Sequence, residues 1–311
     1  MSTTAFVFPG QGSQSVGMLN ELANNYPLIS ELFTAVSERV GYDVWHLVQH
    51  GPESKLNQTE HTQVAMLTAD VAVYKIVQQQ GTIKAQIMAG HSLGEYAALV
   101  CADAISLADA AALVAKRGQL MQQTVPVGQG AMAAIVGLTD EQVQTVCAQA
   151  STHDYQVSPA NYNAIGQVVI AGHTQAVEKA LTYADAMGAR IAKTIAVSVP
   201  CHCPLLAQTA ELFDKYLQQT PFKVPVIPVI SNVDLSIYQS PEQIKRLLKE
   251  QLFRPVRWVE TVQLMKQRGI EVVIECGPAK VLSGLIKRID KSLLAMSVND
   301  TASLELALSA V

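Results

Sequence analysis

Short apolar runs alternate with longer helical patterns along this chain, and that alternation limits the folds it can adopt. The runs are rich in Val, Ile and Ala, as buried strands are, and the segments between them carry apolar residues at helical spacing. The predicted strands are Ala5–Phe8, Ala85–Ala89, Val226–Ile230 and Val272–Glu275. Strands that alternate with helices form a mainly parallel sheet, so the sequence predicts an α/β fold.

The middle of the chain has a different order of elements. It reads strand, helix, two strands, helix and strand, which is the split β-α-β or ferredoxin-like order. The predicted segments are Ala131–Leu138, Asp140–Ala150, Tyr155–Ala160, Val168–Ala171, Thr174–Met187 and Ile191–Val199. Gly and Pro in Val125–Gly130 indicate an entry linker, and Pro200 marks the exit. We therefore expect a small domain, 125–199, inserted into a discontinuous larger domain, 1–124 and 200–311.

Composition excludes several classes of function. The formal net charge is -4, from 26 acidic and 22 basic residues, so the chain lacks the positive excess of a nucleic-acid binder. The uncharged stretch Gly118–Thr139 contains several glutamines and a proline, which a spanning helix in a bilayer would not accept. The start of the chain has no secretory signal, and the five cysteines have no disulfide-framework spacing. We expect a soluble, cytoplasmic protein and, because no coiled-coil or interface pattern is visible, a monomer.

A G-x-S-x-G pentapeptide, Gly90–Gly94, directly follows a predicted strand and directly precedes a helical run. A strand-turn-helix of this kind holds its serine in a strained, exposed conformation, and its two glycines let neighbouring backbone approach closely. The sequence therefore predicts Ser92 as a nucleophile. The helix that begins beside it and the backbone amide of Leu93 are suited to stabilising an oxyanion. The alternative is a tight turn with an ordinary serine.

A serine nucleophile needs a base, and His202 is the best placed of the seven histidines. It lies in an apolar segment that two prolines stiffen, at the exit of the predicted small domain. His91 adjoins the serine in sequence, which makes direct pairing awkward. We predict His202 as the base, with a buried structural histidine as the alternative. Cys201 and Cys203 flank it, but the chain offers no second ligand pair for a structural zinc, so no metal site is predicted.

Arg117 stands in the apolar stripe of a predicted helix, Leu107–Gln122, which begins with a capping box at Ser106 and Asp109. A guanidinium in that stripe needs a partner. One interpretation is that the side chain extends to the surface, as arginines often do. The other is a fixed, bidentate receptor for a carboxylate on the substrate, which would select acyl groups that bear a free acid.

The segment Phe8–Gln14 also follows a predicted strand, and its two glycines free the backbone for an unusual turn. Such a loop can bring a second amide to the oxyanion at Ser92, as the elbow architecture requires. Phosphate binding is the alternative, although the glycine pattern is incomplete and no P-loop lysine follows.

Taken together, these motifs closely resemble the malonyl-CoA:acyl carrier protein transacylases of fatty acid synthesis, over nearly the whole chain. The matching segments are Phe8–Gln14, Thr62–Gln63, Gly90–Glu95, Arg117, Asn161–Asn163, Gly166–Gly172, Ser198–His202, Gln251–Leu252, Pro255–Trp258 and Gly277–Leu282. The resemblance implies an α/β-hydrolase-like large domain that carries a ferredoxin-like small domain. It also implies transfer of a malonyl group from malonyl-CoA to the phosphopantetheine thiol of acyl carrier protein, in ping-pong order. No cofactor is implied, because malonyl-CoA is a substrate and phosphopantetheine belongs to the carrier protein.

The resemblance further implies roles for individual residues. Ser92 attacks the malonyl thioester with His202 as base, and Arg117 pairs with the malonyl carboxylate. The family orients its histidine by a main-chain carbonyl, and the matching position is Gln251. The amides that hold the oxyanion are those of Gln11 and Leu93. The positions that match the acyl pocket are Gln63, His91, Asn161 and Asn163.

Acyl carrier protein is an acidic partner in this family, so a basic patch is expected near the entrance of the site. The candidate residues for this patch are Arg190, Lys193, Lys280, Lys287 and Arg288.

Two other functions use some of the same features. A serine thioesterase or other hydrolase has the same elbow and histidine, but Arg117 and the lack of a distinct triad acid favour a transferase. A non-catalytic binding module is disfavoured because Ser92, His202 and Arg117 are all present.

Overall fold

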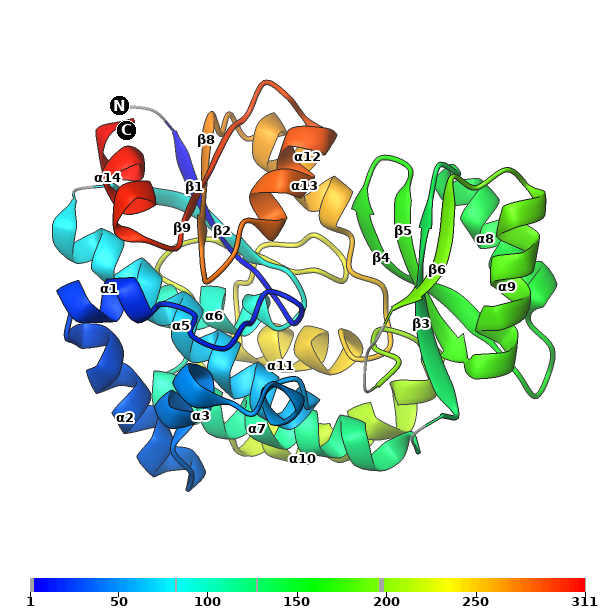
Figure 1. Cartoon of the computed structure of the whole chain (residues 1–311), viewed down its shortest axis with the longest axis horizontal. Coiled ribbons are helices and arrows are strands. Elements are labelled where there is room, and N and C mark those ends of the chain that lie inside the picture. The colour runs from blue at the N-terminus through cyan, green and yellow to red at the C-terminus, as the bar shows by residue number, and fades with distance from the viewer. Residues whose placement is uncertain (1–2, 82, 127, 196–198, 311) are drawn as a thin grey trace.

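The computed structural model describes residues 3–81, 83–126, 128–195 and 199–310. The larger part of the molecule contains a five-stranded sheet in the order β7-β2-β1-β8-β9, and all its pairings are parallel (Figure 1). Its strands are β1 (Thr4–Phe8), β2 (Ala85–Gly90), β7 (Val229–Ile230), β8 (Val272–Cys276) and β9 (Leu294–Val298). This parallel sheet and the helices around it confirm the predicted α/β class.

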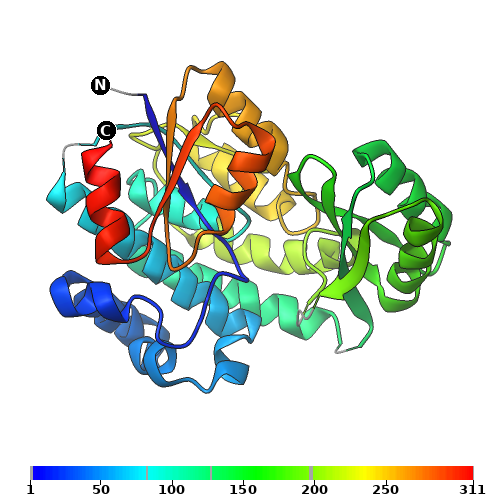
Figure 2. The ribbon, with the colours of Figure 1, turned by 45° about the horizontal axis from the view of Figure 1, so that its top comes forward.

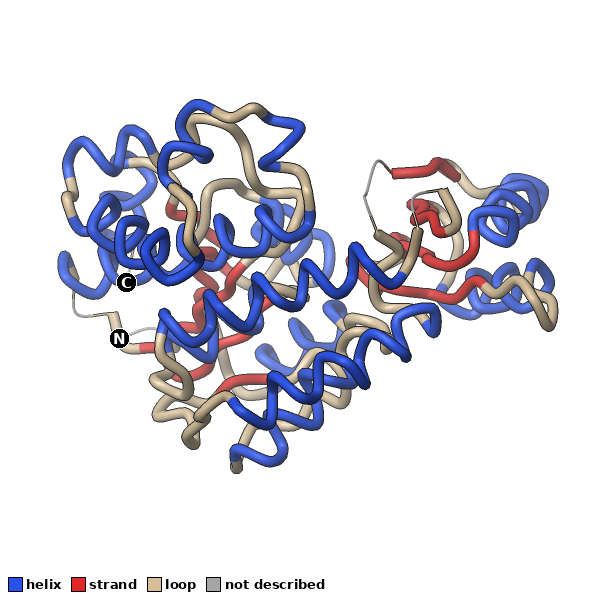
Figure 3. Tube along the Cα trace, turned by 90° about the horizontal axis from the view of Figure 1, so that it is seen from below, coloured by secondary structure: helices blue, strands red, loops and turns tan. Residues whose placement is uncertain are grey.

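Helices cover both faces of the parallel sheet, whose strands lie between them in Figure 3. The helices before residue 125 are α1 (Asn20–Asn25), α2 (Leu28–Val40), α3 (Val44–His50), α4 (Glu53–Leu56), α5 (Thr59–Gln80), α6 (Gly94–Cys101) and α7 (Leu107–Thr124). Those after residue 200 are the short 3-10 helix η1 (Pro204–Leu206), α10 (Ala207–Gln219), α11 (Pro241–Glu250), α12 (Trp258–Gln267), α13 (Val281–Ile289) and α14 (Thr301–Ser309).

The two faces of the sheet build two hydrophobic cores, because alternate side chains of a strand point in opposite directions. Phe6 and Phe8 of β1 belong to the larger core, which includes side chains from α2, α5, α6 and α7. Ala5 and Val7 face the other way, into a core formed with α12 and α13. The sheet is thus buried on both sides, as an all-parallel sheet must be.

The second sheet has four strands in the order β4-β5-β3-β6, with antiparallel pairings. Its strands are β3 (Gly130–Val136), β4 (Val157–Ala164), β5 (Gln167–His173) and β6 (Ile191–Ile195). One face packs against α8 (Asp140–Ala150) and α9 (Thr174–Ala186), with which it shares a hydrophobic core. Figures 1 and 2 show this sheet and its two helices as the smaller part of the molecule, beside the larger one.

Several predicted elements differ from the structure. Of the predicted strand Val226–Ile230, only Val229–Ile230 is a strand. The N–H of Val226 donates to Ala102, and Pro228, which has no N–H, only accepts a hydrogen bond from Met88 of β2. β9 was not predicted. The predicted strand Ile191–Val199 is described only to Ile195, since residues 196–198, Ser198 among them, lie outside the described residues, as does residue 127 of the predicted linker.

The predicted capping box at α7 forms only in part. The Ser106 hydroxyl accepts from the N–H of Asp109, but the Asp109 carboxylate bonds that hydroxyl instead of the N-cap backbone.

Among the described residues, no helix is long and apolar enough to cross a membrane.

Candidate active site

The turn between β2 and α6 places Ser92 at the carboxyl end of the parallel sheet. Ser92 has a φ of 54°, a left-handed conformation that strains a residue with a side chain. Close backbone contacts require the glycines on either side. A Cβ on Gly90 would lie 1.8 Å from the carbonyl carbon of Gly94, and a Cβ on Gly94 would lie 2.0 Å from the carbonyl oxygen of Phe8. The G-x-S-x-G spacing is therefore what lets strand, serine and helix meet in so tight a turn.

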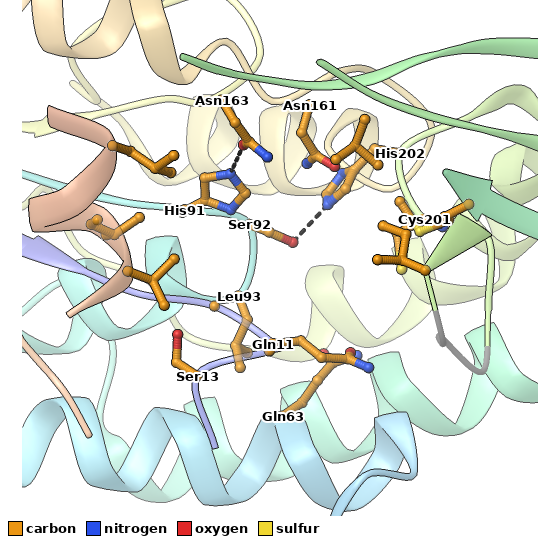
Figure 4. A pocket seen from close by; sticks show the side chains of 18 of the residues that line it. Gln11, Ser13, Gln63, His91, Ser92, Leu93, Asn161, Asn163, Cys201 and His202 are labelled. Atoms are coloured by element: carbon orange, nitrogen blue, oxygen red, sulfur yellow. Dashed lines mark hydrogen bonds between the residues drawn. The ribbon is translucent and has the colours of Figure 1, made fainter. Parts of the chain in front are cut away.

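Ser92 and His202 are in direct contact, although 110 positions separate them in the chain. The Oγ of Ser92 lies 2.7 Å from Nε2 of His202 (Figure 4). On the other side of the ring, Nδ1 of His202 lies 2.7 Å from the main-chain oxygen of Gln251. The Nδ1–H donates to this carbonyl, so the neutral ring presents Nε2 as an acceptor for the serine proton. No side-chain carboxylate is needed to orient the histidine.

His202 is buried and uncharged. Burial, and then the positive charge of Arg117, lower the pKa of His202 from 6.5 to about 3. Its backbone is held by a hydrogen bond from its N–H to the carbonyl oxygen of Leu252, just beyond α11. A neutral imidazole is the form that can accept a proton from Ser92, so the ring is ready to act as a base at neutral pH.

Two backbone N–H groups next to Ser92 have no protein acceptor within the part of the chain that the structure describes: those of Gln11 and Leu93. Both residues line the cavity in front of the serine. Leu93 is also the N-cap of α6, where the helix dipole is positive. This combination is suited to a negatively charged oxygen.

Arg117 points inward from α7 and is only 2% exposed, so the surface interpretation was wrong. Its Nη1 donates to Oε1 of Gln63 at 2.8 Å, and its Nη2 donates to Oε1 of Gln251 at 3.0 Å. Its guanidinium lies 5.6 Å from the ring centre of Tyr96. Its Nε has no hydrogen-bond partner, and no carboxylate of the described residues lies within ion-pair distance of it. A buried charge held only by neutral amides can still accept a carboxylate.

Ser92, His202 and Arg117 meet in one cavity of about 230 Å³ between the two sheets. Figure 4 shows His91, Asn161 and Asn163 on one side of it and Gln11, Gln63 and Leu93 on the other. The apolar side chains that complete its wall are Met132, Val169, Ile195, Val281, Leu282 and Leu285, with Cys201 beside them. All the predicted site residues therefore line this cavity, except Gln251, which lies behind it.

His91 is held away from the serine. Its Nε2 lies 2.8 Å from Oδ1 of Asn163, and its ring packs against Trp258. Burial lowers the pKa of His91, so the neutral ring donates its Nε2–H to Asn163. Asn161, 6% exposed, lies on the neighbouring part of β4. These side chains shape one wall of the cavity.

The cysteines beside the histidine are in the thiol form. Burial raises the pKa of Cys201 to about 11 and that of Cys203 to about 12. A thiolate is the reactive form, so neither is activated as a nucleophile at neutral pH. The described residues include no cluster of His, Cys, Asp or Glu that could hold a metal ion.

Asn232 is a site residue that the sequence did not reveal. Its Oδ1 accepts the N–H of Ser92 at 2.7 Å, and its Nδ2 donates to the carbonyl oxygen of Gly90 at 2.6 Å. The amide thus braces both sides of the strained turn. Asn232 follows β7, which pairs with β2. Residues just beyond the carboxyl ends of neighbouring parallel strands often form a binding site, and this position was the sequence signal that could have identified Asn232.

A strained serine, a neutral histidine and two free amides in one cavity are typical of enzymes that transfer acyl groups through a serine ester. A family model for the acyl transferase domain matches residues 5–307. The malonyl CoA-acyl carrier protein transacylase of Salmonella typhimurium is 48% identical over 309 residues, which are 99% of this chain and 100% of that protein. The chain therefore belongs to the acyl transferase family.

Two solved structures place it more narrowly. An acyl carrier protein S-malonyltransferase from Vibrio cholerae is 51% identical, with a TM-score of 0.96 over 98% of this chain and 100% of that one. A malonyl-transacylase in complex with a type II PKS acyl-carrier protein is 48% identical, with a TM-score of 0.98 over 100% of both chains. Within the family, this chain is an acyltransferase of the malonyl CoA-acyl carrier protein transacylase group.

Proposed function

We propose that this protein transfers the malonyl group of malonyl-CoA to the phosphopantetheine thiol of acyl carrier protein, which supplies extender units for fatty acid synthesis. The observation that carries the proposal is Arg117, a buried guanidinium in the same cavity as Ser92, with an unbonded Nε and no carboxylate partner among the described residues. A malonyl group bears one free carboxylate, which a guanidinium binds through paired hydrogen bonds. The names of the full-length relatives support the same substrate.

The first half-reaction forms a malonyl ester on Ser92. Nε2 of His202 accepts the hydroxyl proton as Oγ attacks the thioester carbonyl, and the N–H groups of Gln11 and Leu93 stabilise the oxyanion. His202 then gives the proton to the departing CoA thiol. Because the charge of Arg117 is one cause of the low pKa of His202, a carboxylate bound to Arg117 makes the histidine a stronger base.

The second half-reaction reverses the first with a different thiol. After CoA leaves, the phosphopantetheine thiol of acyl carrier protein gives its proton to His202 and attacks the ester carbonyl. The oxyanion forms again at the same two amides, and Ser92 leaves as the alcohol. The two thiols use one site in turn, which is a ping-pong sequence.

The domain organisation belongs to the same proposal. We assign residues 1–124 and 200–311 to an α/β-hydrolase-like domain and 125–199 to a ferredoxin-like inserted domain. The strand order β4-β5-β3-β6 and its antiparallel pairing support the second assignment.

We assign four further residues to the acyl pocket: Gln63, His91, Asn161 and Asn163. Their place in the cavity lining supports this assignment.

Acyl carrier protein is the proposed macromolecular partner, because one relative is solved in complex with such a protein. Lys280 and Lys193 are the best supported of the basic candidates, since Val281 and Ile195 close to them line the cavity. Arg288 is already bonded to Gln167 through its Nη1 at 2.7 Å. The monomeric state, the cytoplasmic location and the lack of a cofactor stay predictions.

Incubation with labelled malonyl-CoA and acyl carrier protein tests the proposed function. The expected product is malonyl-acyl carrier protein, formed at the rate at which CoA is released. Free malonate without malonyl-carrier product would contradict the transferase and would support the thioesterase alternative.

A further inference from the structure

Glu95 is a carboxylate that the proposed chemistry does not use, although it lies next to the nucleophilic turn. It is 0% exposed, in the first turn of α6. Three donors point at it: the Tyr238 hydroxyl, the Nε2 of Gln251 at 2.6 Å and, more weakly, the N–H of Asn232 at 3.3 Å. A buried carboxyl with this many donors is a built feature of the site.

The Gln251 side chain joins Glu95 to Arg117. Its Oε1 accepts from Nη2 of Arg117, while its Nε2 donates to Glu95 and to the carbonyl oxygen of Ser92. A guanidinium can only donate and a carboxylate can accept, so the orientation of the amide is fixed from both ends. One amide therefore separates the positive charge of Arg117 from the negative charge of Glu95.

Glu95 is an acidic group on which the charge of Arg117 acts when no substrate is bound. No carboxylate of the described residues forms an ion pair with Arg117. The positive charge of Arg117 is the charge that lowers the pKa of Glu95. The carboxylate of a bound acyl group would add a negative charge beside Arg117. Glu95 and the acyl carboxylate would then share the one positive charge of this buried guanidinium. Two carboxylates that share a site cannot both stay ionised without a cost.

We propose that Glu95 takes up one proton from solvent when a substrate carboxylate binds Arg117, and releases it when the acyl group leaves. This inference rests on the proposed function. The proton adds to the carboxylate oxygen that faces Tyr238, because a hydroxyl can accept as well as donate. The other oxygen continues to accept from Gln251, so the amide and Arg117 keep their positions.

The surroundings of Glu95 suit a proton that comes and goes near neutral pH. Burial raises the pKa of Glu95 from 4.5 to about 7, although Tyr238, Gln251, Asn232 and Arg117 act to lower it. The titratable or charged groups that face it are Arg117 from α7, Tyr96 from α6 and Tyr238 from the loop before α11. Substrate binding offsets the Arg117 charge and so favours the protonated form further.

Calorimetric titration in two buffers of different ionisation enthalpy measures this proton directly. Ser92→Ala prevents turnover, so that malonyl-CoA only binds. At pH 7.5 we expect uptake of a substantial fraction of one proton with malonyl-CoA and none with acetyl-CoA, which lacks the carboxylate. The uptake should disappear in S92A/E95Q and persist in S92A/D70N. Asp70 is the matched control, since it is also a fully buried carboxyl but has no hydrogen bond to Gln251 or Arg117.

Steady-state kinetics give a second test that needs no variant at Glu95. The KM for malonyl-CoA should rise on the order of 5-fold from pH 6 to pH 8, whereas that for acetyl-CoA stays level. Tyr238→Phe removes a donor from the carboxylate and should move the malonyl-CoA profile to higher pH. Equal proton uptake with both acyl-CoAs, or uptake that survives in E95Q, would overturn the inference. Failure of the wild type to form malonyl-acyl carrier protein would instead overturn the proposed function.

Discussion

Replacing Arg117 with alanine tests whether this guanidinium selects the acyl group. The side chain is 2% exposed, and its two hydrogen bonds, at 2.8 and 3.0 Å, go to neutral amides, so no carboxylate of the described residues occupies the guanidinium. Removal of one member of a buried ion pair costs about 3 to 5 kcal/mol. We therefore expect kcat/KM for malonyl-CoA to fall at least about 10²-fold in Arg117→Ala.

Acetyl-CoA is the internal control for that experiment, because its acyl group places no carboxylate near Arg117. Transfer of acetyl groups should be retained or should increase, since the substitution removes a buried charge that an acetyl group leaves without a bound carboxylate. The assay measures kcat/KM for both acyl-CoAs with one acyl carrier protein. Lys116→Ala, which changes the preceding residue of α7, should leave both values unchanged, since Lys116 does not line the cavity. Equal losses for malonyl and acetyl transfer would refute the proposed selection and would indicate a structural role.

Three further substitutions test other parts of the structure. His202→Ala should slow CoA release in the acylation step by about 10² to 10⁴, and an unchanged rate in rapid-mixing experiments would exclude His202 as the base. Burial, and then the charge of Glu275, raise the pKa of Asp70 well above 3.8, so the folded protein holds a proton that the unfolded chain releases above about pH 4. This proton should therefore make the free energy of unfolding fall with rising pH by about 1.4 kcal/mol per pH unit, from about pH 4 up to the raised pKa of Asp70, and Asp70→Asn should remove that contribution; the same change of unfolding free energy with pH in wild type and variant, measured by denaturant titration, would contradict it. Gly94→Ala places a Cβ 2.0 Å from the carbonyl oxygen of Phe8, so unfolding free energy should fall by about 1 to 3 kcal/mol and activity with it; wild-type values would show that the turn tolerates a side chain.

Local signals predicted much of the fold. The helix Asp140–Ala150 was predicted with the bounds that it has, and in the structure Thr139 and Gln142 form a full capping box at its start. β9 lacks such a signal, because its burial does not alternate along the strand: Leu294 is exposed, Ala295 and Val298 are buried, and the two residues between them are half-buried. Its place at the edge of the sheet is set by pairing with β8, which a single sequence does not reveal.

The site was predictable where chemistry has a local pattern. Ser92 lies in a turn whose glycines the sequence displays, and His202 lies in a segment stiffened by prolines. Asn232 and the side chain of Gln251 gain their roles only when distant segments meet, since they bond to Ser92 across 140 and 159 positions of the chain. Glu95 follows the serine by one helical turn, but its partners come from two other loops, so its burial could not be read from the spacing.

The most direct test of the central claim is the identity of the covalent intermediate. The protein is mixed with malonyl-CoA in the absence of acyl carrier protein, quenched in acid and digested for mass spectrometry. We predict one malonyl group on the peptide that contains Ser92, its loss when acyl carrier protein is added before quenching, and no adduct in Ser92→Ala. CoA release without an adduct on Ser92, or an adduct on another residue, would contradict the account.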